Sequence, residues 1–353
     1  MLLAFSSGPA AAAAGCESSG DLHFICGAEQ PEDLARVPGT RWLIASGFSA
    51  GSGLKLIDTV GRSAQRWYTG SAAQIRPDAR QFPQCPGPPD AQSFNAQGLN
   101  LRPVGDRQYR LRVANHGGRE TVEVFDIDAR QPVPALRWRG CLPLPQGLAA
   151  NSVAAYSDGT TLITVLARPG HTYADFVNGL DTGGVYEWRP ALGRFVLIPG
   201  SELPGNNGLE TAADDSGFFV VAFGRHSIRR YQRDGTHPVE SVAPGFMPDN
   251  VHWDGGRLIA AGMSYDEPAC GGVRKVIDGV ADAMRCHRGF TIAELDPSRM
   301  TFQVLVAEPP NAVFNGVSAA VLIDGTYWIG SYQADRLAYR RESNGGTPPV
   351  KPR

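Results

Sequence analysis

Carboxylate and amide side chains stand side by side at Asp249 and Asn250, shortly before a strand-like run at Arg257–Gly262. Oxygen atoms of these kinds are the ligands that Ca²⁺ prefers in proteins. A single pair of this type is also common in turns, where Asp and Asn side chains satisfy backbone groups. The pair becomes informative because similar polar residues recur before other strand-like runs along the chain.

One sequence unit, made of a polar residue, a short apolar stretch, a turn and a strand-like run, occurs six times. The polar residues that mark the six units are Glu32, Gln97, Asn151, Asn207, Asn250 and Asn315. They follow one another at intervals of roughly 40 to 65 residues, which suits a four-stranded propeller blade with variable loops. A second alternating run follows each unit, for example Thr121–Asp126 and Phe290–Leu295, as a hairpin requires.

These repeats predict an all-β protein, a six-bladed β-propeller with a metal site in its central channel. The propeller is expected to span residues 21–342 as a single domain, after a signal-like or disordered segment at 1–20 and before a flexible tail at 343–353. The 42 Gly and 27 Pro residues favour short strands and turns over long helices. A pair of β-sandwiches with coincidental spacing is the alternative.

The predicted metal site follows from the geometry of a propeller, in which equivalent positions of every blade converge on the central channel. The expected ring of ligands contains Glu32, Asn151, Asn207, Asp249 and Asn250. Two carboxylates and three amides suit Ca²⁺, which takes six to eight oxygen ligands in flexible geometry. Zinc and manganese are alternatives that oxygen-only ligation disfavours, and a metal-free polar plug in the channel is another.

Charge and hydropathy exclude some classes of partner. The net charge of -2 provides no basic field for nucleic acid, and no apolar run reaches the roughly 18 residues that span a bilayer. The start of the chain resembles a secretory signal, and Ala13–Cys16 resembles a bacterial lipoprotein cleavage site. The start therefore predicts a periplasmic or secreted protein, with a lipoprotein anchored at Cys16 as one form and a mis-started N-terminus as the alternative.

The six cysteines contain no C-x-x-C pair, so a zinc knuckle or a redox motif is not expected. Their even number and the signal-like start permit disulfides. Cys270 and Cys286 bracket one loop and are the predicted pair, although six cysteines allow 15 pairings.

Taken in order, short motifs over about Cys26 to Arg340 make the chain resemble the paraoxonase and arylesterase group within the gluconolactonase-like, calcium-dependent six-bladed propellers. The motifs are Pro31–Leu34, Phe94–Gly98, Ala114–His116, Asn151–Val153, Asn206–Leu209, Asp249–Val251 and Asn315–Ser318. The resemblance implies a catalytic calcium on the same five residues as the predicted ring. It also implies a second, structural calcium on Asp33, the Leu99 carbonyl and an Asp that this chain replaces with Ser152.

The resemblance also implies catalytic residues, and here the chain departs from the family. Paraoxonases have a water-activating His at the position of Gln97, with a second His behind it that matches His116. An amide cannot accept a proton at neutral pH. Either His116 acts directly, or a ring carboxylate such as Asp249 does the work, or the chain is not a hydrolase of that type.

The predicted function is a calcium-dependent hydrolase of small-molecule esters or lactones, with Asp249, His116 and Gln97 as candidate catalytic residues. Two alternatives are a non-catalytic propeller that binds a ligand or a protein, and a sugar-lactone hydrolase of the gluconolactonase type. Several loop aromatics are candidates to line a pocket: Phe94, His171, Tyr173, Phe176, Phe246, Trp253 and Phe314.

Overall fold

The protein is built from repeated antiparallel sheets. The computed structural model describes residues 16–342, and within them six sheets have four strands each. Blades 1 to 3 consist of β2 (Leu34–Arg36), β3 (Trp42–Ala45), β4 (Lys55–Asp58), β5 (Ser63–Arg66); β6 (Ala96–Gly105), β7 (Gln108–Asn115), β8 (Thr121–Asp128), β9 (Ala135–Pro143); and β10 (Val153–Ala155), β11 (Thr161–Val165), β12 (Gly184–Arg189), β13 (Arg194–Leu197).

Blades 4 to 6 follow the same plan, with one long insertion in blade 5. They consist of β14 (Asn206–Thr211), β15 (Gly217–Ala222), β16 (Ser227–Gln232), β17 (Val239–Val242); β18 (Phe246–Asp254), β19 (Arg257–Ser264), β24 (Phe290–Asp296), β25 (Thr301–Glu308); and β26 (Val317–Ile323), β27 (Thr326–Ser331), β28 (Arg336–Arg341), β1 (His23–Cys26).

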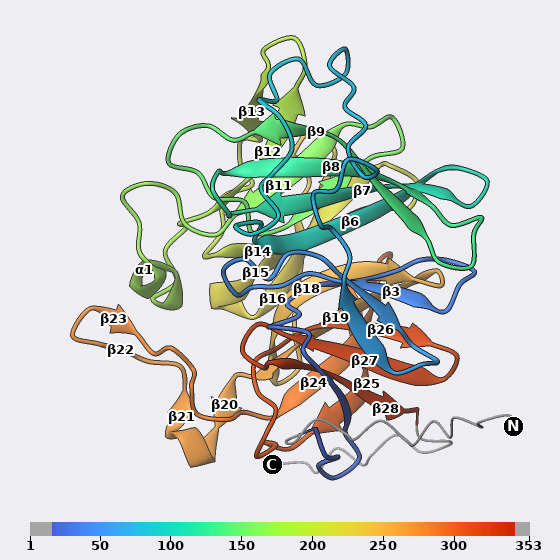
Figure 1. Ribbon diagram of the computed structural model, residues 1–353. Coiled ribbons are helices and arrows are strands. Elements are labelled where there is room, and N and C mark those ends of the chain that lie inside the picture. The colour runs from blue at the N-terminus through green and yellow to red at the C-terminus, as the bar shows by residue number, and fades with distance from the viewer. Residues whose placement is uncertain (1–15, 343–353) are drawn as a thin grey trace, which may run out of the picture.

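The first strand of each blade lies innermost, and these six strands form a closed circle. β2 contacts β6, β6 contacts β10, β10 contacts β14, β14 contacts β18, β18 contacts β26, and β26 contacts β2. Figure 1 shows the blades following one another in chain order, from blue to red. The prediction of an all-β, six-bladed propeller is confirmed.

Each strand packs on both of its faces, because a blade lies between two neighbours. In β3, Trp42 and Ile44 belong to the apolar cluster shared with blade 2, whereas Leu43 and Ala45 belong to the cluster shared with blade 6. Successive strand residues point to opposite faces of a sheet. A strand covered on both faces therefore reads as a continuous apolar run, as Phe218–Ala222 does in β15.

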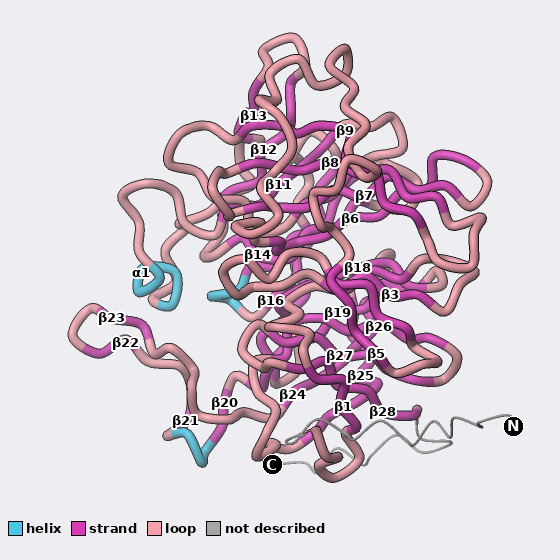
Figure 2. The backbone as a smooth tube through the Cα atoms, in the orientation of Figure 1, coloured by secondary structure: helices cyan, strands magenta, loops and turns pink. Residues whose placement is uncertain are grey.

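Three insertions rise on the same face of the ring. They are α1 (Tyr173–Val177) between β11 and β12, the 3₁₀ turn η1 (Phe223–Arg225) between β15 and β16, and residues 265–289 between β19 and β24, which we call the arm. The arm contains β20 (Asp266–Glu267), η2 (Pro268–Cys270), β21 (Gly272–Val273), β22 (Val276–Ile277) and β23 (Val280–Ala281). Figure 2 shows the three helical segments on one side of the molecule.

Three disulfides, Cys16–Cys26, Cys85–Cys141 and Cys270–Cys286, link all six cysteines of the chain. The predicted Cys270–Cys286 pair is confirmed. The lipid expected on Cys16 stays a prediction, and in this structure the sulfur of Cys16 is bonded to that of Cys26. Such a set of disulfides indicates an oxidising environment, either extracellular or periplasmic.

The domain boundary at residue 20 stays a prediction, and the structure describes residues on both sides of it. Residues 16–22 belong to the folded part, through the disulfide of Cys16 and a backbone bridge between Ser19 and Leu22. The rest of the predicted signal-like segment and the tail at 343–353 lie outside the described residues. Within residues 16–342, no helix has the length and apolar character needed to cross a membrane.

Candidate functional site

Irregularities in strand pairing aim the polar residues of the repeat into the channel. Within residues 16–342, the register between the inner strand and the next one shifts at five places, and one of them, Pro103 to Gly105, lies at the far end of β6. The other four lie near the polar residues of the repeat: Ala96 to Leu99, Asn206 to Leu209, Pro248 to Asn250, and Val317 to Ala319. A β-bulge bends its strand and redirects a side chain that regular alternation would place elsewhere. Gln97, Asn207 and Asp249 all lie within these irregular stretches.

Glycines let neighbouring inner strands approach closely at the same level. A Cβ atom on Gly208 would lie 2.4 Å from the backbone oxygen of Asp249 and 2.8 Å from the Cα atom of Asn250. A Cβ on Gly98 would lie 2.7 Å from the backbone oxygen of Asn151. The glycine that follows the polar residue of the repeat is therefore a packing requirement of the ring.

Four of the five predicted ligands are connected directly by side-chain contacts. The Asn250 amide donates to Glu32 Oε1 at 2.8 Å, and the Asn207 amide hydrogen-bonds the Asp249 carboxylate. Glu32 and Asp249 lie close enough that their charges repel each other. These four side chains are almost completely buried, with exposed fractions between 2% and 6%.

Asn151 is the fifth predicted ligand and reaches the ring through the backbone of its neighbours. The backbone carbonyl oxygen of Asn151 accepts from Gly98 N at 3.2 Å, and its backbone N–H donates to the Thr164 carbonyl at 2.8 Å. Thr164 Oγ1 in turn donates to the Asn207 carbonyl at 2.6 Å. Blades 2, 3 and 4 are thus tied together at the level of the ring.

Buried oxygens without a partner mark this cluster. Glu32 Oε2, Asn151 Oδ1, Asn207 Oδ1 and Asn250 Oδ1 are all inaccessible to solvent and have no hydrogen-bond donor among the described residues. Buried polar atoms in folded proteins are rarely left unpaired, so a group of four calls for an explanation. A cation with oxygen ligands would satisfy all four, and the residues present therefore fit Ca²⁺.

The donor set also explains which metals fit. Within residues 16–342, no group of three or more His, Cys, Asp or Glu side chains is arranged to hold a metal ion. A site in the ring therefore depends on amide oxygens as much as on carboxylates. This composition suits a hard cation such as Ca²⁺ better than zinc.

Electrostatics at the ring favour the neutral forms of its acids when no cation is present. Burial, with added repulsion from Asp33 and Asp249, raises the pKa of Glu32 well above its ordinary value. Burial also raises the pKa of Asp249 to about 7, although the hydrogen bond from Asn207 opposes the shift. Two carboxylates with raised pKa values in one buried cluster are a common feature of functional sites.

Asp33 lies next to the ring in sequence but is committed to protein partners. Its Oδ1 accepts from His252 Nε2 at 2.8 Å, and its Oδ2 accepts from Leu99 N at 2.7 Å. Burial opposes a charged imidazole, but Asp33 and Glu210 together raise the pKa of His252 to about 10. The positive charge of protonated His252 thus balances the negative charge of Asp33, at the position where the resemblance implied a second calcium. Ser152 Oγ, from the same implied site, has no hydrogen-bond partner among the described residues.

His116 stands behind Gln97 and does not reach the ring by itself. The Nε2 atom of His116 contacts Gln97 Oε1, and its Nδ1 lies 2.8 Å from Glu120 Oε2. Gln97 itself is buried, with an exposed fraction of 7%. The structure thus brings both sequence-predicted residues together, but in a row in which Gln97 comes first.

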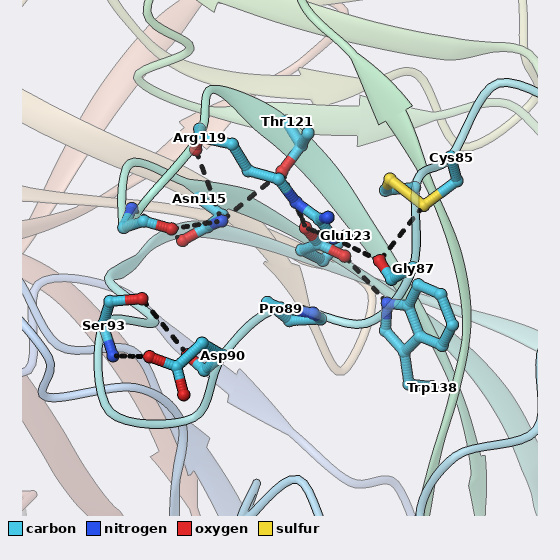
Figure 3. A network of polar contacts seen from close by, with 12 residues as sticks. Cys85, Gly87, Pro89, Asp90, Ser93, Asn115, Arg119, Thr121, Glu123 and Trp138 are labelled. Atoms are coloured by element: carbon cyan, nitrogen blue, oxygen red, sulfur yellow. Dashed lines mark hydrogen bonds and ion pairs between the residues drawn. A yellow bond between two sulfur atoms is a disulfide. The ribbon is translucent and has the colours of Figure 1, made fainter.

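A buried polar network holds the loop that carries His116. Asn115 Oδ1 accepts from Gly117 N at 2.8 Å and from Asn95 N at 3.1 Å. Glu123, which is fully buried, accepts from Trp138 Nε1 at 2.8 Å and from Arg119. Figure 3 shows Arg119 and Trp138 converging on Glu123, with Asn115 beside them. Blade 2 therefore presents His116 on a rigid loop.

Asn315, the sixth polar residue of the repeat, has another role. Its Oδ1 accepts from Arg288 N and its Nδ2 donates to the Met284 carbonyl, both at 3.1 Å. It therefore fastens the base of the arm to blade 6. Sequence reasoning also missed Tyr332, on whose hydroxyl the charge of Asp249 acts, and Arg274 in the arm. An interblade loop and an insertion carry no trace of the repeat.

The aromatic residues predicted to line a pocket divide into different groups. Phe176 lines a cavity of about 230 Å³ between α1, η1 and the arm. Trp253 instead lines a cavity of about 580 Å³ at the other end of the channel, together with Arg36 and Asp254. Phe94 is fully buried between blades 1 and 2. Phe176 and Trp253 thus each line a cavity, at opposite ends of the channel, whereas Phe94 lines neither of these two.

Comparison with known proteins shows the fold. No family model and no curated protein matches the chain. A structural-genomics protein of unknown function from Bacteroides thetaiotaomicron matches with a TM-score of 0.54 and 13% identity, over 92% of this chain and 73% of that one. A "putative gluconolactonase" matches with a TM-score of 0.52 and 14% identity, over 91% and 92% of the two chains. The chain is thus a six-bladed β-propeller, similar in fold to that gluconolactonase structure.

Proposed function

We propose that the chain is a calcium-dependent hydrolase of esters or lactones. The observation that carries the proposal is the group of four buried, unpartnered oxygens beside Asp249. The ion would be held by Glu32, Asn151, Asn207, Asp249 and Asn250. When bound, Ca²⁺ supplies a Lewis acid that polarises a carbonyl oxygen.

Asp249 is our candidate for the general base. Its carboxylate lies in the ring beside the proposed ion, and burial raises its pKa to about 7 only while no cation is present. A bound Ca²⁺ would keep the carboxylate ionised, which is the form that accepts a proton. The Asp249 carboxylate would take one proton from a water molecule as the water oxygen bonds to the substrate carbonyl carbon. The bond to the alcohol or ring oxygen then breaks, and that oxygen takes up a proton.

Gln97 and His116 fit a positioning role better than a catalytic one. The amide of Gln97 cannot accept a proton at neutral pH, and Gln97 separates His116 from the ring. Of the three alternatives left open by the sequence, the geometry therefore favours a ring carboxylate as the base. His116 and Glu120 would hold the Gln97 amide in place at the wall of the channel.

The first test measures hydrolysis of phenyl acetate and a panel of lactones in EGTA, and again after Ca²⁺ is restored. We expect activity to vanish and return, and Asp249→Asn to lower it by roughly 10² to 10⁴, equivalent to several kcal/mol of lost stabilisation. Calorimetric titration with Ca²⁺ gives a readout independent of activity. Full activity in EGTA, or full activity in Asp249→Asn, would refute the proposal.

A second candidate function is a non-catalytic propeller that binds a small ligand. Gln97 favours it, because the chain has an amide where the resembling hydrolases have their basic histidine. Tight calcium binding without hydrolysis of any ester or lactone would support this candidate. A sugar-lactone hydrolase receives less support, because the cavity beside the ring is lined mainly by aromatic and aliphatic side chains.

A further inference from the structure

The arm carries an arginine that forms no direct ion pair among the described residues, although the charge of Asp282 acts on it from a distance. Arg274 lies between β21 and β22, and its Nε donates to the Asp282 carbonyl at 2.8 Å. The Asp282 carboxylate accepts instead from Met284 N at 3.0 Å. Within residues 16–342, Arg274 forms no ion pair with a carboxylate, so its terminal nitrogens are available to a ligand.

Arg274 borders a small apolar cavity, which we call the Arg274 pocket. Its volume is about 230 Å³, and its walls include Phe176, Phe223, Met247 and Tyr265. The guanidinium carbon of Arg274 lies 5.6 Å from the centre of the Phe176 ring. Arginine over an aromatic ring is a stable arrangement that still leaves its terminal N–H groups free to bind an anion.

The histidine that lines the pocket is neutral. His226 stacks on Tyr265 with ring centres 5.0 Å apart, and burial lowers its pKa. Among the described residues that line the pocket, Arg274 is therefore the one with a charge at neutral pH. A ligand for this pocket should combine one negative charge with an apolar body.

The pocket opens beside the calcium ring proposed above. Met247, in its wall, stands two positions before Asp249 in β18, and η1 packs on that strand. Tyr332 connects the two sites electrostatically, because the charges of both Asp249 and Arg274 act on its hydroxyl. The tip of the arm contacts α1, as Figure 1 shows for β23. A molecule with its carbonyl at the ring could thus place a second group against Arg274.

The environment of Arg274 favours an anionic partner. Burial lowers the pKa of Arg274, because a charge removed from water loses its hydration. A carboxylate would restore that lost stabilisation, since its two oxygens match the fork of N–H donors on a guanidinium. The cavity is smaller than a typical drug-sized pocket, which limits the apolar body to about one ring or a short alkyl chain.

We propose that the Arg274 pocket binds a free carboxylate on the apolar part of the substrate, and that preferred substrates are aryl or short alkyl esters or lactones with this second, charged group. The proposal rests on the hydrolase function proposed above and adds the class of substrate. Arg274 would determine specificity, at a distance from the bond that breaks.

A matched pair of esters tests the role of the charge. We compare kcat/KM for 4-acetoxybenzoate and for its neutral methyl ester, in the wild type and in Arg274→Gln. The wild type should prefer the charged ester, and Arg274→Gln should lower the ratio of the two kcat/KM values by roughly 10- to 100-fold, as expected for a lost charge-assisted hydrogen bond. Arg274→Lys keeps the charge but loses the fork, so its ratio should lie between the two.

Lys275→Gln is the matched control, because Lys275 is the next residue of the same arm, is exposed and does not line the pocket. It should leave the ratio unchanged. An unchanged ratio in Arg274→Gln, or an equal fall in Lys275→Gln, would overturn the proposal. Melting temperatures of all three variants show whether the arm and the propeller remain folded.

A binding measurement separates this proposal from the hydrolase function. Calorimetric titration with 4-hydroxybenzoate and with neutral 4-hydroxybenzamide is carried out in EGTA, so that the carboxylate cannot bind calcium. We expect the acid to bind to the wild type and to Lys275→Gln, and to bind at least tenfold more weakly to Arg274→Gln. Such binding without hydrolysis of either ester would refute the proposed hydrolase function and support carboxylate binding in the Arg274 pocket. Hydrolysis of both esters, with equal binding of the acid and the amide, would refute carboxylate binding in the Arg274 pocket and support the hydrolase function.

Discussion

Asp249 shows at the scale of one residue how burial prepares a site for a cation. Its carboxylate is 6% exposed and shares its surroundings with Glu32. Without a cation, both acids prefer the protonated form, because burial disfavours their charge. A bound Ca²⁺ would reverse that preference, so calcium binding and proton release should be linked.

The stability of the metal-free protein should therefore depend on pH in a particular direction. Asp249 has a folded-state pKa of about 7 against an ordinary value of 3.8. Its contribution to stability is complete below about pH 4 and is lost as the pH rises toward about 7. In EGTA, we expect this group to lower the free energy of unfolding by up to about 1.4 kcal/mol for each unit by which the pH rises in this range.

Melting curves between pH 4 and pH 6.5 measure this component, in a range below the ordinary pKa of histidine. Asp249→Asn, which cannot titrate, should flatten the dependence. Calcium should raise the melting temperature more at pH 6.5 than at pH 4, because only the carboxylate form binds it. Identical slopes in the wild type and in Asp249→Asn would contradict the assignment.

The residues of the ring could be predicted from the sequence because each stands at the same place in a repeat. Asp249, Asn207 and Glu32 were found in this way, although their roles as calcium ligands remain a prediction. The charge state of His252 could not be predicted, because it depends on Asp33 and Glu210 in two other blades. Arg274 was missed because its arm belongs to no repeat.

At the scale of the element, the bulged inner strands need small residues where they meet. Gly208 in β14 leaves room for the backbone of β18 at Asp249 and Asn250. A methyl group there would push two proposed ligands away from the other three. The spacing of polar residues predicted the strands, whereas the bulges that aim the side chains became visible only in the pairing register.

Gly208→Ala should therefore weaken calcium binding by roughly tenfold or more and lower stability by about 1–3 kcal/mol, the usual cost of overpacking. Gly217→Ala is the matched control, because a Cβ on Gly217 of the same blade would lie 1.9 Å from the Tyr231 carbonyl oxygen. It should lower stability but leave the calcium affinity of the folded protein unchanged. Calorimetry measures the affinity and chemical denaturation the stability. Equal loss of affinity in both variants would mean that the effect is general.

At the scale of the whole molecule, the two ends of the described chain meet in blade 6. β1 pairs with β28, with Phe24 opposite Ala338 and Ile25 opposite Leu337. The sequence predicted the number of blades but not this closure, because four residues near the start of the chain carry no sign of a partner near its end. Two of the three disulfides were likewise missed, since cysteine spacing alone does not determine pairing.

Deleting residues 1–26 should destabilise blade 6 and with it the closed ring, because it exposes the unpaired edge of β28 and uncovers the apolar cluster that Ile25 helps to fill. We expect aggregation or loss of a single cooperative unfolding transition, measured by size-exclusion chromatography and circular dichroism. A Cys16→Ser, Cys26→Ser variant keeps β1 and should lose only about 3 kcal/mol of stability. A deletion variant that stays monomeric and unfolds cooperatively would show that the remaining strands close the ring without β1.

The shared sixth blade also has a consequence in time. During synthesis, β1 leaves the ribosome before the other described strands, whereas its partner β28 follows all of them. Blades 1 to 5 can form as they appear, but the channel cannot be enclosed before the strands of blade 6 have been synthesised. The ring of calcium ligands, which joins residues from blades 1, 3, 4 and 5, should therefore assemble only at the end. A nascent chain should gain no stability from calcium until its final strand is present.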